Sequence, residues 1–326
     1  MASTTTVPPT PRARPSAGRR RARATAPTAV VDAKSTAVCR PAADSCDIAE
    51  SCDGSSDTCP PDAVQPDGAS CSDDNTCTIG DTCQSGVCTG TPDPDGCADD
   101  FLCYKARTGT PFTPILAVNL ADQFEANQNY DLVKVLDLCT PTNKNNQGVL
   151  DQQTHLRSYK IRAVAGSPRF SRRHVKVTNQ LPAQQFLDVL KPDLLYVPTA
   201  KSLTTPPPER GPNDVDHYKC YKAKVTAGTP KFPKGIQVTV TDQFRTTPGA
   251  FDVKKPRHLC TPVSKNGEPV HNPDAHLVCY VARPARGQAK HVPRAPVYVH
   301  DQFGPQTLAT VKEDELCIPS LKTVLP

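Results

Sequence analysis

The chain has 326 residues, with 35 prolines, 15 cysteines and no tryptophan, and hydrophobic residues make up 37% of it. This composition supports only modest hydrophobic cores and favours turns and edge strands. Fifteen cysteines indicate an oxidising compartment, because a reducing cytosol would leave most of them as exposed thiols. We therefore expect a secreted or cell-surface protein. No stretch reaches the roughly 18 apolar residues of a membrane-spanning helix, so we expect no membrane span.

Charge is distributed unevenly along the chain, although the formal net charge is only +5. Residues 1–38 contain seven bases and one acid, a net charge of +6. Residues 39–100 contain one base and 14 acids, a net charge of −13. Residues 101–326 contain 30 bases and 18 acids, a net charge of +12. An acidic segment attracts cations, and a basic one attracts acidic polymers or surfaces. The alternative is that the segments are solvated faces that differ in charge without a ligand.

Residues 1–38 are rich in Arg, Pro and Thr, which predicts a disordered basic tail. The tail lacks the apolar run of about seven or more residues that a secretory signal contains. We give the cysteines more weight and expect either a start further upstream or a fragment. The run Arg19-Arg20-Arg21 is also compatible with a nuclear or nucleic-acid tag. A nuclear protein with so many cysteines would need zinc, so we expect no nucleic-acid partner.

The acidic segment 39–100 contains nine cysteines and no histidine. Zinc sites favour two cysteines separated by two to four residues, often with His. The closest pair in this segment is Cys83 and Cys88, and the other spacings are longer. The segment has no apolar run that could form a core. These features predict a small disulfide-rich module with little regular secondary structure.

The first part of this module has a distinctive order of residues: Cys39-Arg40, Cys46-Asp47, Glu50-Ser51-Cys52, Gly54-Ser55-Ser56, Cys59-Pro60 and Asp67-Gly68. In these positions residues 39–71 resemble the C-terminal half of the disintegrin-like domain of the ADAM and snake-venom metalloprotease families. The resemblance implies that the loop of Ser45 and Asp47 binds a cell-surface or matrix protein such as an integrin. Asp47 would be the ligand for a cation held by that receptor. The chain has no H-E-x-x-H zinc helix, so the protease of those families is absent.

Four oxygen-bearing side chains follow in the second part of the module: Asp73, Asp74, Asn75 and Asp81. Oxygen-rich turns of this kind bind Ca²⁺, which makes calcium the candidate cofactor. The complete calcium-loop pattern with its terminal Glu is not present. The alternative interpretation is that Asp and Asn are there because they form turns.

From residue 101 onward the sequence repeats itself four times, in units of roughly 55–60 residues. The first shared element is a Tyr-Lys strand at 101–105, 155–160, 217–222 and 276–280. The second is Asp-Gln-Phe or its relaxed form, at 122–124, 179–181, 242–244 and 301–303. The third is Leu-Cys-x-Pro or its relaxed form, at 138–141, 195–198, 259–262 and 316–319, and it is followed by Lys144, Lys201, Lys265 or Lys322. These elements resemble an uncharacterised repeat of secreted bacterial proteins.

Copy 2 lacks both repeated cysteines and has Ser158 and Tyr196 in their places. Because the two are lost together, we predict one disulfide inside each other copy: Cys103–Cys139, Cys220–Cys260 and Cys279–Cys317. Each bridge closes a loop that is expected to contribute roughly 3–4 kcal/mol. The remaining nine cysteines leave one thiol unpaired. We predict Cys39, because the resembling family supplies its partners from a preceding half-domain.

Period-two alternation at 174–178, 235–241 and 296–300 predicts strands, and helix signals are poor. We therefore expect all-β repeat domains of the antiparallel sandwich or barrel type. The expected organisation is a tail at 1–38, the disintegrin-like module at 39–100, a first repeat pair at 101–203, a Pro-rich linker at 204–215 and a second repeat pair at 216–326.

The repeated Asp-Gln-Phe element is expected to be a structural turn, in which Asp caps backbone N–H groups and Phe anchors the turn. No nucleophile elbow, phosphate loop, dinucleotide fingerprint or zinc-protease motif is present. We therefore expect an exported, non-enzymatic adhesion or binding protein. One alternative is a structural envelope or matrix component. Another is anionic polysaccharide binding by the basic repeats, helped by the repeated tyrosines (Tyr104, Tyr159, Tyr221 and Tyr280) if these are exposed and not part of the core.

Overall fold

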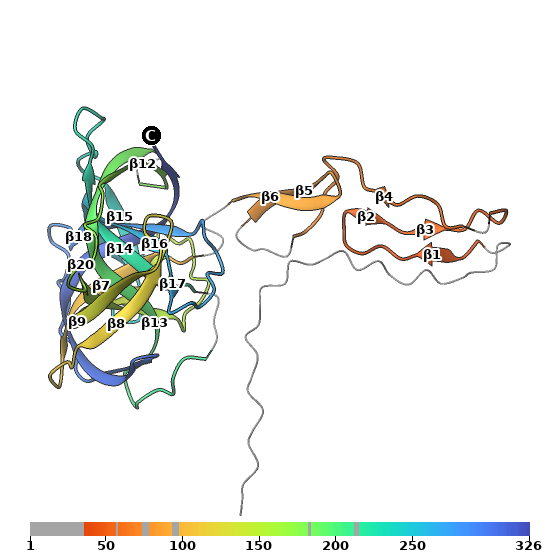
Figure 1. The fold of residues 1–326 in the computed structure, drawn as a ribbon. Helices are drawn as coiled ribbons and strands as arrows, with labels where there is room; N and C mark the ends of the chain where they lie inside the picture. Colours follow the sequence, from red (N-terminus) through yellow and green to blue (C-terminus); the bar gives the residue numbers. More distant parts are fainter. Residues whose placement is uncertain (1–35, 57, 74–77, 93–97, 182–183, 212–214) are drawn as a thin grey trace, which may run out of the picture. The chain divides into compact units, whose positions relative to one another are not determined.

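The computed structural model describes residues 36–56, 58–73, 78–92, 98–181, 184–211 and 215–326. All regular elements in these residues are β-strands (Figure 1), which confirms the predicted all-β class. The described residues divide into two compact units, one within 36–73 together with 81–89, and the other with 78–80 and those from 90 to 326. The described residues include no helix that is long and apolar enough to cross a membrane.

The cysteine-rich segment contains six short strands: β1 (Val38–Arg40), β2 (Asp47–Ile48), β3 (Glu50–Ser51), β4 (Ala63–Val64), β5 (Thr78–Gln84) and β6 (Val87–Pro92). They form three separate two-stranded sheets, β1 with β3, β2 with β4 and β5 with β6. Three disulfides connect the segment: Cys39–Cys59, Cys46–Cys83 and Cys71–Cys88. Covalent links thus replace the hydrophobic core that a segment of this size does not have.

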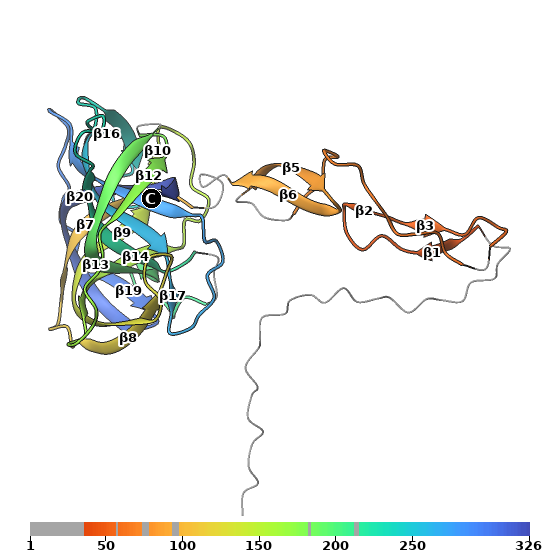
Figure 2. The same ribbon diagram turned by 45° about the horizontal axis from the view of Figure 1, so that its top comes forward.

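The repeats form a closed ring of eight strands, two from each copy (Figures 1 and 2). In ring order they are β7 (Phe101–Thr108), β9 (Gln128–Pro141), β11 (His155–Ala163), β13 (Gln185–Ser202), β14 (Tyr218–Val225), β16 (Gly249–Pro262), β18 (His276–Pro284) and β20 (Gly304–Val324). All neighbours in the ring are antiparallel, and β20 closes the ring by pairing with β7. The architecture is therefore a β-barrel, in which closure removes the open edges of the sheet.

Four shorter strands lie beside the ring: β8 (Ile115–Ala121), β12 (Arg173–Thr178), β15 (Gln237–Thr241) and β19 (Val297–Asp301). Each pairs on one edge with the long ring strand of its own copy. On the other edge each pairs with chain from the copy two positions along. Thus β8 pairs with β17 (Ser264–Lys265), β15 with β10 (Asn143–Lys144), β12 with the end of β20, and β19 with the end of β13.

This exchange differs from the predicted stacking of two repeat pairs, 101–203 and 216–326. Copies 1 and 3 exchange strands, as do copies 2 and 4, so all four copies form one intertwined barrel. The predicted linker 204–215 has no regular structure at its described residues. It joins β13 to β14, which are hydrogen-bonded neighbours in the ring. Because the linker joins two neighbouring strands of one barrel, it does not hold two repeat pairs apart.

Two hydrophobic clusters follow from the alternation of side chains along the ring strands. In β7, Phe101 and Cys103 belong to the inner cluster, whereas Leu102 and Tyr104 belong to the outer one, which also contains the side strands. All eight ring strands contribute to the inner cluster, which includes the six repeated cysteines. The prediction of a separate disulfide-rich module therefore needs correction, because three disulfides lie inside the barrel. Residues 78–80 of the cysteine-rich segment are also assigned to the barrel unit.

Candidate functional site

The Asp-Gln-Phe elements are turns, as predicted. In copy 1, Asp122 Oδ1 accepts the backbone N–H groups of Phe124 and Glu125 at 2.8 and 2.9 Å. In copy 3, Asp242 Oδ1 accepts those of Phe244 and Arg245, both at 2.8 Å. The carboxylate thus caps backbone donors that the turn would otherwise leave unpaired.

The second oxygen of each turn aspartate binds the repeated tyrosine of the copy two positions along. The hydroxyl of Tyr221 donates to Asp122 at 2.6 Å, and that of Tyr104 donates to Asp242 at 2.7 Å. In copy 4, Asp301 accepts from Tyr159 of copy 2 at 2.9 Å. The Tyr-Lys and Asp-Gln-Phe elements are therefore two halves of one structural contact, which links opposite copies.

All four repeated tyrosines (Tyr104, Tyr159, Tyr221 and Tyr280) are fully buried. Of the two alternatives for these tyrosines, the core position is the one observed, so they are not exposed to help bind a polysaccharide. Burial raises the pKa of each phenol, most clearly that of Tyr221, which also faces the charge of Asp122. These rings stay protonated and serve as hydrogen-bond donors or acceptors within the outer core.

Two buried cations bind the same turns, and the sequence analysis missed both. The guanidinium of Arg157 donates to both oxygens of Asp301, and both residues are 1% exposed. The ammonium of Lys219 lies 2.6 Å from a carboxylate oxygen of Glu125. Copies 1 and 4 have Leu102 and Val278 at this position. The sequence did contain a signal for these two cations, because copies 2 and 3 have a charged residue at a position where copies 1 and 4 have an apolar one.

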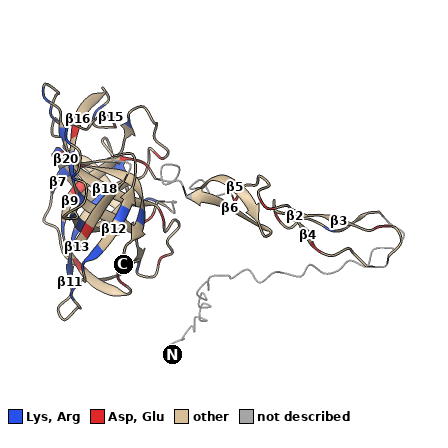
Figure 3. Cartoon of the chain, turned by 90° about the horizontal axis from the view of Figure 1, so that it is seen from above, with Lys and Arg blue, Asp and Glu red and all other residues tan. Residues whose placement is uncertain are grey.

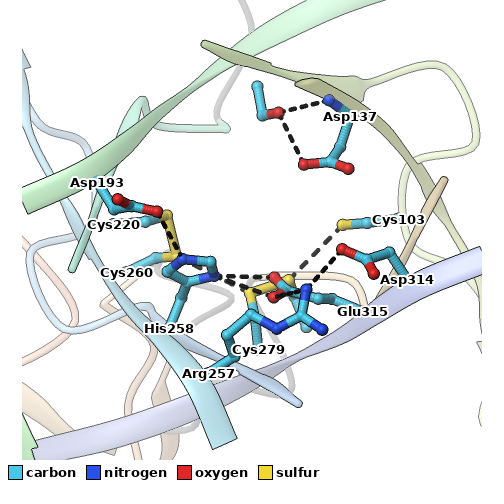
Figure 4. Close-up of polar contacts among 12 residues, drawn as sticks. Cys103, Asp137, Asp193, Cys220, Arg257, His258, Cys260, Cys279, Asp314 and Glu315 are labelled. Carbon is cyan, nitrogen blue, oxygen red and sulfur yellow. Dashed lines mark hydrogen bonds and ion pairs between the residues drawn. A yellow bond between two sulfur atoms is a disulfide. The ribbon is translucent and has the colours of Figure 1, made fainter. Parts of the chain in front are cut away.

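The barrel interior also contains a polar cluster next to the disulfides (Figure 4). His258 lies between two carboxylates, with Nε2 3.2 Å from Asp193 and Nδ1 3.0 Å from Glu315. Burial alone lowers the pKa of His258, but the charge of Glu315 and the hydrogen bonds to both carboxylates raise it to about 9. His258 is therefore a protonated imidazolium at neutral pH. The three residues come from three different copies, so no local sequence pattern links them.

Around this histidine the cluster continues as a network of ion pairs. Lys105 lies 3.0 Å from Asp137 and 2.9 Å from Asp314, and Arg257 lies 2.6 Å from Asp314. Burial raises the pKa of Asp137 to about 6, against the opposing charge of Lys105. Perturbed pKa values gather at functional sites, but structural ion-pair networks produce them too. Here the alternating charges balance one another inside the barrel, which favours a structural role.

In the cysteine-rich segment, the predicted binding residues Ser45 and Asp47 lie on either side of Cys46, Ser45 in the turn before β2 and Asp47 at the start of β2. Ser45 is exposed, and Asp47 is partly buried. The Asp47 carboxylate accepts the backbone N–H groups of Ala43 and Ile48 at 2.8 and 2.9 Å. Asp47 therefore shapes the loop in addition to any contact it makes with a partner.

The pairing of β2 with β4 brings further carboxylates to this loop. Oxygen atoms of Asp47, Glu50 and Asp62 lie within 4.8 Å of one another. The guanidinium of Arg40 lies 3.0 Å from both Glu50 and Asp62, so it neutralises part of this charge. Of the four predicted calcium ligands, Asp73 and Asp81 are described, and the backbone N–H of Asp73 donates to Asp81 at 3.2 Å. Asp74 and Asn75 lie outside the described residues, and the calcium site stays a prediction.

The three predicted repeat disulfides, Cys103–Cys139, Cys220–Cys260 and Cys279–Cys317, are all present. In each, the two cysteines are directly opposite each other on neighbouring ring strands. The prediction that Cys39 is the unpaired thiol is wrong. Cys39 is bonded to Cys59. Among the described cysteines the free thiol is Cys52, which is buried.

The histidines that recur before the Tyr-Lys strand pack inside the barrel unit. His155 and His276 are each 1% exposed, and burial holds their pKa well below the usual value. His217 lies at a pocket of about 520 Å³ and contacts Glu268 at 2.9 Å. The pocket also contains His271, whose ring binds Asp216 at 3.1 Å. Each of the two histidines is thus within hydrogen-bond distance of a carboxylate of its own unit.

One family model matches the chain, and it covers residues 155–319, about half of the sequence. Its description is a repeat of unknown function, DUF7450. The match begins at the Tyr-Lys strand of copy 2 and ends at the Leu-Cys-x-Pro element of copy 4, so it spans three of the four copies. No curated protein and no solved structure matches the chain.

Proposed function

We propose that this chain, which belongs to the family of repeats of unknown function described as DUF7450, is an exported, non-enzymatic adhesion or binding protein. Because the family description names no function, the proposal is based on the chain's own residues. The observation that supports this most strongly is the set of six disulfides in the described residues, three of them inside the barrel. Disulfides persist in oxidising compartments outside the cytosol. A disulfide-bonded barrel would serve as a rigid scaffold. The disulfide-bonded acidic segment would present its loops to a partner.

The proposed contact is the disintegrin-like loop of Ser45 and Asp47. The Cys46–Cys83 disulfide fixes this loop, so little conformational entropy is lost when a partner binds. Ser45 is exposed there. A cation held by a cell-surface or matrix protein would accept Asp47 as an oxygen ligand. A purely structural component of an envelope or matrix is the alternative, and it would show no such discrete binding.

Replacing Asp47 with Ala is expected to abolish binding to a cell-surface or matrix protein, and EDTA is expected to abolish it for the wild type. Adhesion of the full chain to immobilised surface proteins, with and without EDTA, measures both effects. Asp53→Ala is the matched control, because Asp53 also accepts two backbone N–H groups, those of Ser55 and Ser56, in the same segment. Equal loss in the two variants would mean that loop distortion, and not a lost ligand, is the cause.

A second candidate function is the binding of an anionic polysaccharide by the barrel. Residues 101–326 hold 30 bases and 18 acids. Since the repeated tyrosines are buried, this binding would depend on charge and would weaken as salt rises. Retention of the full chain on a sulfated polysaccharide at physiological salt tests this function.

A further inference from the structure

One lysine recurs in all four copies, always five residues before the position of the second repeated cysteine. The four are Lys134, Lys191, Lys255 and Lys312. All four are exposed, and none of their side chains forms a hydrogen bond or an ion pair with another described residue. By contrast, the lysine that follows each Leu-Cys-x-Pro element is held by polar or aromatic partners in the neighbouring copy. A repeated, exposed and unpartnered lysine has no evident role in stability.

Three of these lysines stand directly opposite a second lysine on the neighbouring ring strand. The facing pairs are Lys134 with Lys160, Lys191 with Lys222, and Lys312 with Lys105. Like charges in directly opposed positions destabilise a sheet. At the fourth position Lys255 has Lys254 next to it in the sequence. The barrel therefore tolerates the same unfavourable arrangement at three places around its ring.

These side chains share one end of the barrel and its inner side. Lys105, Lys160 and Lys222 each follow by two residues an inner position, namely Cys103, Ser158 and Cys220, so they point to the same side of the sheet. Directly opposed residues also share a side, which places Lys134, Lys191 and Lys312 there. Lys255 lies in the register shift between Val253 and Pro256, and it is included as the repeat equivalent of these three. We call the seven lysines Lys105, Lys134, Lys160, Lys191, Lys222, Lys255 and Lys312 the lysine rim. Figure 3 marks the basic and acidic positions along the strands.

The rim has a surplus of positive charge. The carboxylates that lie next to it are Asp137, Asp193, Asp314 and Glu315, and Arg257 binds two of them. Lys105 and Lys160 contact carboxylates closely, and Lys222 lies 3.7 Å from Asp193. Seven lysines and Arg257 thus face four carboxylates, and protonated His258 adds a further positive charge. The positive charges that this network does not neutralise are those of the four unpartnered lysines.

We propose that the lysine rim binds an anionic polysaccharide, whose carboxylate or sulfate groups lie between the facing lysines. This inference rests on the second proposed function and assigns it to named residues. A ligand with several linked anionic groups suits a ring of cations, because each further contact becomes intramolecular after the first. Single-stranded nucleic acid suits it less well. Such binding relies on aromatic side chains that stack on bases, the rim has none, and the repeated tyrosines are buried.

The test compares two variants of the full chain that carry the same change in net charge. The first replaces Lys134, Lys191, Lys255 and Lys312 with Gln. The second replaces Arg19, Arg20, Arg21 and Arg23 of the basic tail with Gln. The probes are a heparin column, a heparin-derived oligosaccharide in calorimetry, and a single-stranded DNA of matched charge. The rim variant is expected to fold normally, because its four lysines have no partners to lose, and thermal unfolding checks this.

The rim variant is expected to bind the oligosaccharide roughly tenfold or more weakly and to elute from heparin at lower salt than the tail variant. Equal losses in both variants would overturn the rim as the site and leave polysaccharide binding by other residues in place. A wild-type chain that heparin does not retain at physiological salt would overturn both the rim and the second proposed function. Tighter binding of the DNA than of the oligosaccharide would overturn the choice of ligand class.

Discussion

Replacing Arg157 with Ala is expected to lower the free energy of unfolding of the barrel by roughly 3–5 kcal/mol. The guanidinium donates to both carboxylate oxygens of Asp301, and it also donates to the backbone carbonyl of Gly304 at 3.2 Å. Removing it leaves the Asp301 carboxylate buried without its counter-charge. Denaturant unfolding of the two proteins measures the difference. Arg162→Ala is the matched control, since Arg162 is exposed on the same strand and its loss is expected to change little.

The chain itself supplies a way to rescue this variant. In copies 4 and 2, Val278 and Asn179 occupy the positions of Arg157 and Asp301, and Asn179 donates to the hydroxyl of Tyr280 at 2.9 Å. The double variant Arg157→Val with Asp301→Asn is therefore expected to recover much of the lost stability. A double variant as unstable as Arg157→Ala would show that the buried charge is not the cause.

Replacing His258 with Gln is expected to remove a stability loss that the wild type shows at alkaline pH. The folded-state pKa of His258 is raised to about 9, from 6.5 in the unfolded chain. The stability it contributes is therefore fully present below pH 6.5 and is lost as pH rises through about 9. This loss is on the order of 3 kcal/mol. Denaturant unfolding between pH 6.5 and 9.5 measures it for both proteins.

Two half-buried lysines titrate in part of the same range and act in the opposite direction. Burial lowers the pKa of Lys201 and Lys322 to about 8, so their contribution to stability rises with pH above that value. Both lysines are present in the wild type and in the Gln variant. The difference between the two pH profiles therefore isolates His258. Parallel profiles would contradict the placement of a protonated His258 between Asp193 and Glu315.

The sequence predicted those features that repeat in register. Period-two alternation identified strands, and alignment of the four copies identified the turn role of the Asp-Gln-Phe element and the three repeat disulfides. The disulfides could be assigned because Ser158 and Tyr196 replace both cysteines of copy 2 at once. In the structure Tyr196 fills the space of the missing bridge, with its hydroxyl 3.8 Å from the sulfur of Cys103. The loss of both cysteines in the same copy is informative, because it indicates that the two residues bond to each other within one copy.

Features that join different copies could not be predicted in this way. The exchange of strands between copies two positions apart depends on closure of the ring, which no local pattern encodes. The His258 cluster takes one residue from each of three copies, and changes of register along the ring strands alter which side chains face inward. The unpaired thiol was misplaced for a related reason. A resemblance that covers only residues 39–71 gives no information on how Cys39 pairs, because the resembling family pairs this position with cysteines outside the matched residues.

The central claim is that this is an exported protein with disulfides inside its barrel. Mapping the disulfides by mass spectrometry of non-reduced peptides tests this claim most directly. The protein is prepared in an oxidising compartment and alkylated before it is unfolded. The account predicts Cys103–Cys139, Cys220–Cys260 and Cys279–Cys317 as intact bridges, and alkylation of Cys52 only after unfolding. Free thiols at the six barrel cysteines, or bridges between different copies, would contradict both the oxidised barrel and the export that it supports.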